Sequence, residues 1–272
     1  MEKISKCIIT NEVIVTAALG INDASLMLCK SAVTNHTCAT RRRKSAVVTG
    51  SSTGIGFETS LMLARNGFYT YATMRKLEGG GSKQIIDIAK NENLPLQVIQ
   101  LDVDNDKSVS DAINRIVTEN DRIDIVVNNA GYDLAGAIEE ISMDEMRTQF
   151  ETNFFGAIKA MKAVIPIMRK QRSGKIVNIT FMGGRIAIPC HSIYHGSKFA
   201  LEGLSESIQY ELEPFGIKII LIEPGAIGFA YELFFGEMYN SEQYLPYKFL
   251  MLCQAIEVYY RKILEKVSAS RW

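Results

Sequence analysis

The sequence predicts an α/β fold built on a doubly wound parallel β-sheet. From residue 45 onward, short apolar segments alternate with longer stretches of helical pattern. Continuous apolar strands are typical of a parallel sheet that helices cover on both faces, and right-handed crossovers then give the doubly wound arrangement. The 47% hydrophobic fraction is ample for a buried core and excludes a wholly disordered chain.

Six segments have the pattern of buried strands. The first, residues 45–49 (SAVVT), is followed at once by a glycine-rich turn and an apolar helix. The other five are residues 68–74, 97–101, 124–127, 175–180 and 217–222, with helical stretches between them, for example residues 108–119 and 145–170. Residues 255–267 have the pattern of one more amphipathic helix.

Composition excludes several classes of function. The 272 residues carry 30 Lys and Arg against 30 Asp and Glu, so the excess positive charge of a nucleic-acid surface is missing. No apolar run approaches the roughly 20 residues that a membrane-spanning helix needs. The five cysteines are widely spread and lack CxxC spacing, which indicates reduced thiols in a cytoplasmic protein.

Residues 1–44 differ from the rest of the chain, because no clean period of a helix or strand runs through them. We interpret them as a poorly ordered N-terminal extension, or as upstream sequence included by a misplaced start. A secretory signal or a transit peptide is the less favoured alternative, since acidic residues interrupt the pattern and no convincing cleavage site follows. Residues 45–272 are then a single domain with an aromatic-rich tail from about residue 229.

A glycine-rich loop joins the first strand to the first helix. Its residues include Gly50, Ser52, Thr53, Gly54, Ile55 and Gly56, in the spacing G-x-x-x-G-x-G. Glycines let the backbone approach a pyrophosphate, and the helix that follows directs its N–H groups and dipole at the anion. A tight turn also needs glycine, but the position after the first strand of a βαβ unit favours a dinucleotide-binding loop.

The end of the second strand predicts which nicotinamide cofactor binds. An acidic residue there would bind a free ribose 2′-OH, whereas an arginine accommodates a 2′-phosphate. The segment has Arg75 followed by Lys76, and the first acidic residue is Glu78. Arg75 can bind phosphate oxygens with two donors, so NADP(H) is preferred and NAD(H) remains the alternative. The alternative explanation of Arg75 and Lys76 is an ordinary solvated basic turn without a cofactor role.

Further motifs follow in a definite order. They are Leu101-Asp102-Val103 after the third strand, Asn128-Asn129-Ala130-Gly131 after the fourth, Asn153 in a helix, Tyr194 and Lys198 as a Y-x-x-x-K pair, and Pro224-Gly225 after the sixth strand. Together with the glycine loop they resemble the short-chain dehydrogenase/reductase family, over residues 45 to about 228. The resemblance implies a Rossmann-type, NAD(P)-linked oxidoreductase. It also implies cofactor contacts at Asp102, Val103, Asn129, Ala130, Gly131, Tyr194, Lys198, Pro224 and Gly225.

Tyr194 and Lys198 carry the expected chemistry. They are four residues apart, so on a helix they share one face. An ammonium beside a phenol favours phenolate, so we expect a lowered tyrosine pKa and a general acid/base at Tyr194. By resemblance, Lys198 also holds the nicotinamide ribose, and Asn153 supports a water that relays protons to it. The substrate is then a small-molecule carbonyl compound or alcohol.

One family residue is missing. The family usually has a serine 13 residues before its catalytic tyrosine, where it donates a hydrogen bond to the substrate oxygen, and this chain has Phe181 there. Thr180 should point to the opposite face, unless a bulge near Gly183 re-aims it, and Ser192 is a weaker substitute. Two interpretations stay open: a reductase or dehydrogenase that uses Tyr194, Lys198 and Asn153, or a catalytically impaired, cofactor-binding pseudoenzyme.

The tail beyond Pro224-Gly225 gives two more expectations. Its many aromatic residues, at a place where the family has a lid over the substrate, predict a small apolar substrate, although core or oligomer packing explains them equally well. No candidate for the family's seventh strand is found, so we expect a six-stranded sheet. The strand at residues 217–222 would then have an unpaired edge unless a partner or the tail covers it, so we expect an impaired fold, a truncated product, or a homo-oligomer that protects that edge.

Overall fold

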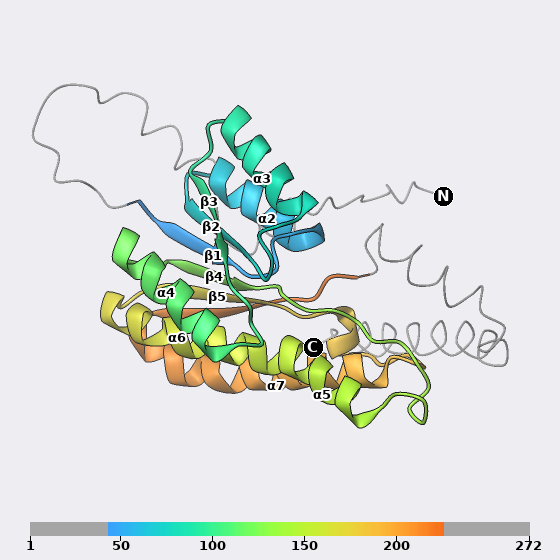
Figure 1. Ribbon diagram of the computed structural model, residues 1–272. Coiled ribbons are helices and arrows are strands. Elements are labelled where there is room, and N and C mark those ends of the chain that lie inside the picture. The colour runs from blue at the N-terminus through green and yellow to red at the C-terminus, as the bar shows by residue number, and fades with distance from the viewer. Residues whose placement is uncertain (1–42, 226–272) are drawn as a thin grey trace, which may run out of the picture. The chain divides into compact units, whose positions relative to one another are not determined.

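The computed structural model describes residues 43–225 and places six strands in one parallel sheet of order β3-β2-β1-β4-β5-β6 (Figure 1). The strands are β1 (Ser45–Val48), β2 (Tyr69–Met74), β3 (Leu96–Gln100), β4 (Ile125–Asn128), β5 (Gly174–Ile179) and β6 (Ile217–Ile222). Each strand begins and ends within one residue of the segment predicted for it. The predicted fold class is confirmed.

The strand order reverses beside β1. In register, Val47 pairs with Tyr71 of β2 on one side and with Val126 of β4 on the other. The chain thus builds β1, β2 and β3 outward in one direction and then returns to the other side of β1. In open parallel sheets, ligands bind beyond the carboxyl ends of the strands at such a reversal.

Six α-helices connect the strands within the described residues. They are α2 (Gly54–Arg65), α3 (Gly80–Asn91), α4 (Asp106–Asn120), α5 (Met143–Phe150), α6 (Gly156–Gln171) and α7 (Ser192–Leu212). The predicted helical stretch over residues 145–170 is confirmed, although it is not α-helical throughout, because a π-helical turn at Glu151–Phe155 separates α5 from α6. Two short 3₁₀ turns, at Met182–Gly184 and Glu213–Phe215, complete the elements.

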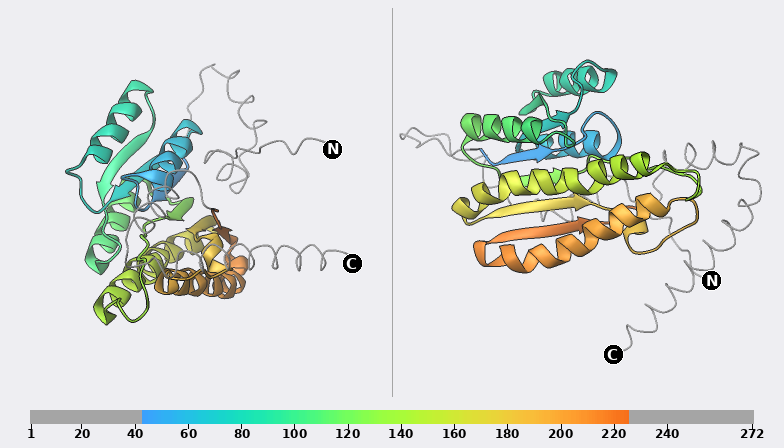
Figure 2. Two further views of the ribbon diagram at one scale, coloured as in Figure 1. Left: turned by 90° about the vertical axis from the view of Figure 1, so that its right-hand side faces the viewer. Right: turned by 60° about the horizontal axis from the view of Figure 1, so that its bottom comes forward.

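Helices cover both faces of the sheet (Figure 1). Helices α2 and α3 lie on one face, and α4 and α6 pack against each other on the opposite face (Figures 1 and 2). Ala46, Val47 and Val48 of β1 and Val126 and Val127 of β4 have no exposed surface at all. Two-sided burial is the physical reason why these strands are continuously apolar rather than alternating.

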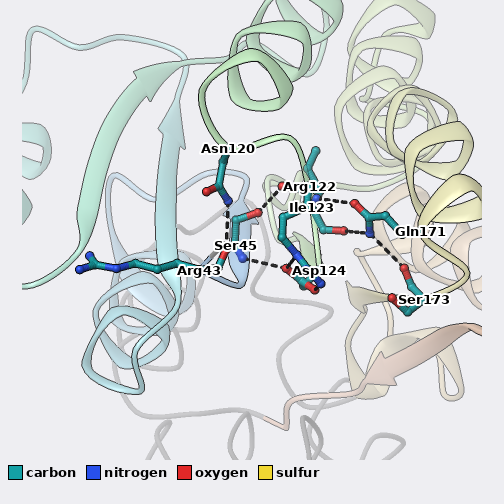
Figure 3. A network of polar contacts seen from close by, with 8 residues as sticks. All are labelled: Arg43, Ser45, Asn120, Arg122, Ile123, Asp124, Gln171 and Ser173. Carbon is teal, nitrogen blue, oxygen red and sulfur yellow. Dashed lines mark hydrogen bonds and ion pairs between the residues drawn. The ribbon is translucent and has the colours of Figure 1, made fainter. Parts of the chain in front are cut away.

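A polar network fixes the amino-terminal edge of the sheet (Figure 3). Asp124 accepts a bond from the Ser45 backbone N–H at 2.9 Å and two from the Arg122 guanidinium, and these bonds raise the pKa of Arg122. The Gln171 side chain accepts from the Ile123 N–H at 2.8 Å and donates to the Ile123 carbonyl at 2.7 Å. Each such bond contributes about 1 kcal/mol to the stability of the folded state. Together they fix the start of β1, the start of β4 and the end of α6 against one another.

The described residues form two compact units. The first contains residues 43–130, 155–178 and 205–222, which include nearly the whole sheet and helices α2, α3, α4 and α6. The second contains residues 131–154, 179–204 and 223–225, which include α5 and the first three turns of α7. Each unit is described by itself below.

Several expectations fall on residues that the structure does not describe. The N-terminal extension, apart from Arg43 and Lys44, lies outside residues 43–225, and so do the aromatic tail, the helix at 255–267 and the question of a seventh strand. The single-domain assignment and the homo-oligomer stay predictions. Among residues 43–225, no helix is long and apolar enough to cross a membrane.

Candidate active site

The glycines of the loop in the first unit are required for two different reasons: close packing at Gly56 and backbone conformation at Gly54. A Cβ atom on Gly56 would lie 2.4 Å from the Gly50 carbonyl oxygen, so no other residue fits there without moving the backbone. Gly54 differs, because it has a φ of +58° and a Cβ atom added there would meet nothing within 4 Å. The backbone at Gly54 is therefore open to a ligand, and only glycine adopts this conformation easily.

Helix α2 begins at this open glycine. Thr53 precedes it with extended backbone and makes no side-chain cap, and the first turn contains no acidic residue. The first N–H groups of a helix need acceptors, and the helix dipole favours an anion at this end. An uncapped, acid-free first turn behind a glycine-rich loop therefore fits a pyrophosphate, with Ser52, Thr53 and Ile55 beside it.

Asn129 and Thr49 join the glycine loop to the end of β4. The Asn129 side-chain amide donates to the carbonyls of Thr49 and Gly50 at 2.9 and 3.1 Å. The Thr49 hydroxyl accepts from the backbone N–H groups of Asn129 and Ala130, each at 3.0 Å. The Asn129 side chain thus has a structural role that its motif did not reveal, and Thr49 was not among the predicted site residues.

The residues expected to bind the adenosine half of a cofactor also lie in the first unit. Arg75 directly follows β2, and both Arg75 and Lys76 are exposed, with no ion-pair partner among residues 43–225. Asp102 accepts a bond from the Asp104 N–H at 3.1 Å, and its own N–H donates to Ser108. The neighbouring Val103 is buried. Arg75 and Lys76 thus present two exposed basic side chains directly after β2, whereas Asp102 orders its own turn.

The second unit brings Tyr194 and Lys198 together on α7. The Lys198 ammonium lies 5.6 Å from the centre of the Tyr194 ring, and it donates to the Ile179 carbonyl at 3.0 Å. Lys198 is only 5% exposed. Burial lowers the pKa of Lys198 to about 8, and this effect exceeds the opposite influence of Asp133 and Glu202. The shared helix face predicted from the spacing is confirmed.

The predicted lowering of the Tyr194 pKa is wrong. Burial is the main cause that raises the pKa of this phenol, and the negative charge of Asp133 raises it further. The Lys198 ammonium, 5.6 Å from the centre of the Tyr194 ring, does not outweigh these two effects. Burial and the Asp133 charge thus favour the neutral form of the Tyr194 phenol.

Asn153 lies in the π-helical turn, and its side chain is fully engaged. Its Oδ1 atom accepts from the Tyr132 N–H at 3.0 Å, and its Nδ2 atom donates to the Tyr132 carbonyl at 2.8 Å and to the Ser197 hydroxyl at 3.2 Å. A Cβ atom on Gly131 would lie 3.0 Å from Asn153 Oδ1 and 3.8 Å from Lys198 Nζ. Asn153, Gly131 and Lys198 are thus close neighbours.

Phe181 lies directly against the candidate catalytic tyrosine. The two rings meet edge to face, with their centres 5.7 Å apart. The chain enters the 3₁₀ turn Met182–Gly184 here instead of a β-bulge. Thr180 is buried and Ser192 is exposed, and no bond from either hydroxyl to Tyr194 is found within the described residues. A hydrocarbon ring thus occupies the position next to Tyr194 where the family has a hydroxyl.

His195 ties the segment after β5 to α7. Its Nδ1 donates to the Gly183 carbonyl at 2.8 Å, and its Nε2 accepts from the Ile188 N–H at 3.2 Å. These two bonds define one neutral tautomer, and burial lowers the pKa of His195 accordingly. The Pro224 carbonyl accepts from the Met182 N–H at 3.0 Å in the same region, and Gly225 follows it on the surface.

Two further charged clusters were missed from the sequence. His191 Nδ1 lies 3.3 and 3.2 Å from the two carboxylate oxygens of Asp133. Arg185 bridges the buried Glu202 at 3.0 Å and Glu223 at 3.1 Å. The members of each cluster are far apart in the sequence and follow no motif, so only the folded structure reveals them.

Neither a metal site nor a disulfide is found in the described part of the chain. Among residues 43–225, no group of three His, Cys, Asp or Glu residues could hold a metal ion. Cys190 is a free thiol whose pKa is raised, mainly by burial.

Comparison with known proteins identifies the family of the chain. A family model described as short chain dehydrogenase matches residues 44–231. A 3-ketodihydrosphingosine reductase from Bacteroides thetaiotaomicron is 41% identical over 180 residues, which are 66% of this chain and 62% of that protein. Retinol dehydrogenase 8 from Bos taurus is 40% identical over 189 residues, which are 68% of this chain and 59% of that protein. The chain thus matches about three fifths of the length of these relatives.

Solved structures lead to the same family. A short-chain dehydrogenase from Streptomyces avermitilis has a TM-score of 0.64 at 34% identity and covers 68% of this chain and 66% of its own. An alcohol dehydrogenase from Thermococcus sibiricus, complexed with 5-hydroxy-NADP, has a TM-score of 0.64 at 26% identity, with coverages of 69% and 78%. The chain therefore belongs to the short-chain dehydrogenase/reductase family, whose members are NAD(P)(H)-linked oxidoreductases with a Rossmann-type fold.

Proposed function

We propose that the protein is an NADP(H)-preferring reductase that converts a carbonyl group on a small apolar substrate to an alcohol, with Tyr194 as proton donor. The observation that carries this proposal is the Tyr194–Lys198 pair, in which the phenol keeps its proton at neutral pH. The names of the two curated relatives denote a ketone reductase and an alcohol dehydrogenase, which supports this substrate class. An NADP(H) preference leans toward reduction.

The chain offers matching groups for the cofactor. The uncapped start of α2, with the open backbone at Gly54, would hold the pyrophosphate, and Arg75 with Lys76 would bind a 2′-phosphate. The alcohol dehydrogenase from Thermococcus sibiricus binds an NADP derivative, which supports this choice. When bound, the reduced nicotinamide supplies the two electrons that reduce the carbonyl carbon.

Tyr194 and Lys198 complete the reaction. The Tyr194 hydroxyl gives its proton to the carbonyl oxygen as the alcohol forms, and a phenolate is left. The Lys198 ammonium, held by the Ile179 carbonyl, stabilises that phenolate. The Asn153 amide is engaged with Tyr132 and Ser197, so we assign Asn153 to positioning the π-helical turn, with support of a relay water as its further role.

A carbonyl panel tests the proposed function directly. The unmodified protein is expected to oxidise NADPH in the presence of apolar ketones or aldehydes. Tyr194→Phe removes only the proton donor, so kcat should fall at least about 100-fold while NADPH binding is retained. NADPH oxidation is followed by absorbance, and cofactor binding by fluorescence. Reduction that survives Tyr194→Phe would contradict the assigned role of Tyr194.

Arg75 is expected to determine the cofactor preference. Arg75→Gln removes a charged, two-donor contact with the 2′-phosphate, which should weaken NADPH binding about 10- to 100-fold and leave NADH binding nearly unchanged. Lys90→Gln, which removes an exposed cation from the end of α3, is the matched control. Titration of all three proteins with both cofactors gives the answer. Tighter binding of NADH than of NADPH by the unmodified protein would overturn the preference.

Phe181 favours a second candidate, the impaired pseudoenzyme, because its ring supplies no hydrogen-bond donor beside Tyr194. Phe181→Ser separates the two functions. Loss of one such donor costs about 10²- to 10³-fold in kcat, so a gain of that size would show that the native site is impaired. For an active reductase, we expect a gain below about 10-fold and a higher KM for apolar substrates. Phe181→Leu, which keeps the apolar character, is the control.

A further inference from the structure

His191 lies three residues before Tyr194 and pairs with Asp133, yet the proposed reaction gives neither residue a role. They come from two different segments, the loop after β4 and the segment that enters α7. The Asp133 side chain is 14% exposed and that of His191 is 2% exposed, and His191 Nδ1 is 3.2 Å from an Asp133 carboxylate oxygen. Since both carboxylate oxygens are acceptors, Nδ1 must carry the proton in this contact.

A second bond joins the same two segments. The Gly136 N–H donates to the Cys190 carbonyl at 2.8 Å. Cys190 has a φ of +61°, which is unusual for a residue with a side chain, so the backbone turns sharply just before His191. The chain enters α7 at Ser192, and Tyr194 lies only three residues beyond His191. The loop at residues 133–136 therefore holds the segment that aims Tyr194.

We propose that Asp133 and His191 form a positioning pair, in which the Asp133 carboxylate holds the His191 ring and His191 fixes the segment from which α7 presents Tyr194. This inference rests on the proposed function, since it concerns the proton donor of that reaction. Neither residue touches the reacting atoms in this scheme, so each acts through Tyr194 and Lys198.

Several charged or titratable side chains surround Tyr194, and Asp133 is the one that affects the pKa of both Tyr194 and Lys198. His195 and Lys198 lie on the same helix, His191 precedes it, and Glu202, paired with Arg185, acts on Lys198. Asp133 is the carboxylate that raises the pKa of the Tyr194 phenol and also opposes the lowering of the Lys198 pKa. Neutralising Asp133 should therefore move both titrations toward lower pH.

The test is the dependence of kcat on pH for carbonyl reduction. The Lys198 pKa of about 8 means that its charge should be lost as pH rises through that value, so we expect activity to fall on the alkaline side. Asp133→Asn keeps the size of the side chain but removes its charge, and we expect the alkaline limb to move down by about one pH unit. At the native midpoint, the variant would then be about five-fold less active than the unmodified protein.

Variants at His191 should behave differently. His191→Asn keeps a donor near the Nδ1 position, so the native profile is expected. His191→Leu removes the donor but leaves the Asp133 charge, so kcat should fall while the alkaline limb stays in place or moves upward. Asp144→Asn, at an exposed carboxylate in the first turn of α5, is the matched control and should leave the profile unchanged.

The outcomes separate this inference from the proposed function. An alkaline limb that does not move in Asp133→Asn, or that moves down equally in His191→Leu, would overturn the positioning pair while Tyr194→Phe stays inactive. Reduction by Tyr194→Phe would instead overturn the proposed function. If Asp133→Asn does not fold, the His191 variants decide: a loss of kcat in His191→Leu that His191→Asn restores supports the pair, and equal loss in both contradicts it.

Discussion

Burial of Lys198, one turn of α7 beyond the partly buried Tyr194, is the constraint that organises the second unit. A charged ammonium and a phenolate are both costly away from water, so neighbouring groups must hydrogen-bond or balance them. The Ile179 carbonyl accepts from Lys198, and the Asp133 carboxylate favours the protonated form of both side chains. His195 and Asn153 in turn hold the adjoining segments through hydrogen bonds to Gly183 and Tyr132.

This arrangement has a cost for stability and a benefit for the proposed reaction. The Lys198 pKa of about 8 lies below its ordinary value of 10.5, so the buried charge destabilises the folded state below pH 8. That cost is relieved as pH rises from the folded pKa toward the unfolded one. The same charge is what stabilises a phenolate, so the stabilisation is present below about pH 8 and is lost above it. A neutral phenol beside a charged lysine is suited to giving a proton to a carbonyl oxygen.

The sequence was sufficient for the framework of the fold but not for the interior of the site. Strands such as β1 and β4 are buried on both faces, and this leaves a continuous apolar run that a single sequence reveals. The π-helical turn at Asn153 depends on bonds to Tyr132, which no local pattern encodes. The direction of the Tyr194 pKa depends on burial and on Asp133, 61 positions away in the chain. Spacing placed Lys198 beside the ring correctly, but it could not tell how much water the phenol had lost.

The central claim is that Tyr194 remains a neutral phenol until strongly alkaline pH. The ionisation of the Tyr194 phenol can be followed as a function of pH by NMR of the protein labelled with ¹³C at the ζ carbon of tyrosine. The Tyr194→Phe variant identifies which resonance belongs to Tyr194. The account predicts that this resonance does not titrate below about pH 10, because burial and Asp133 both oppose ionisation. A Tyr194 resonance that titrates below about pH 9 would contradict it and would mean that Lys198 governs the phenol after all.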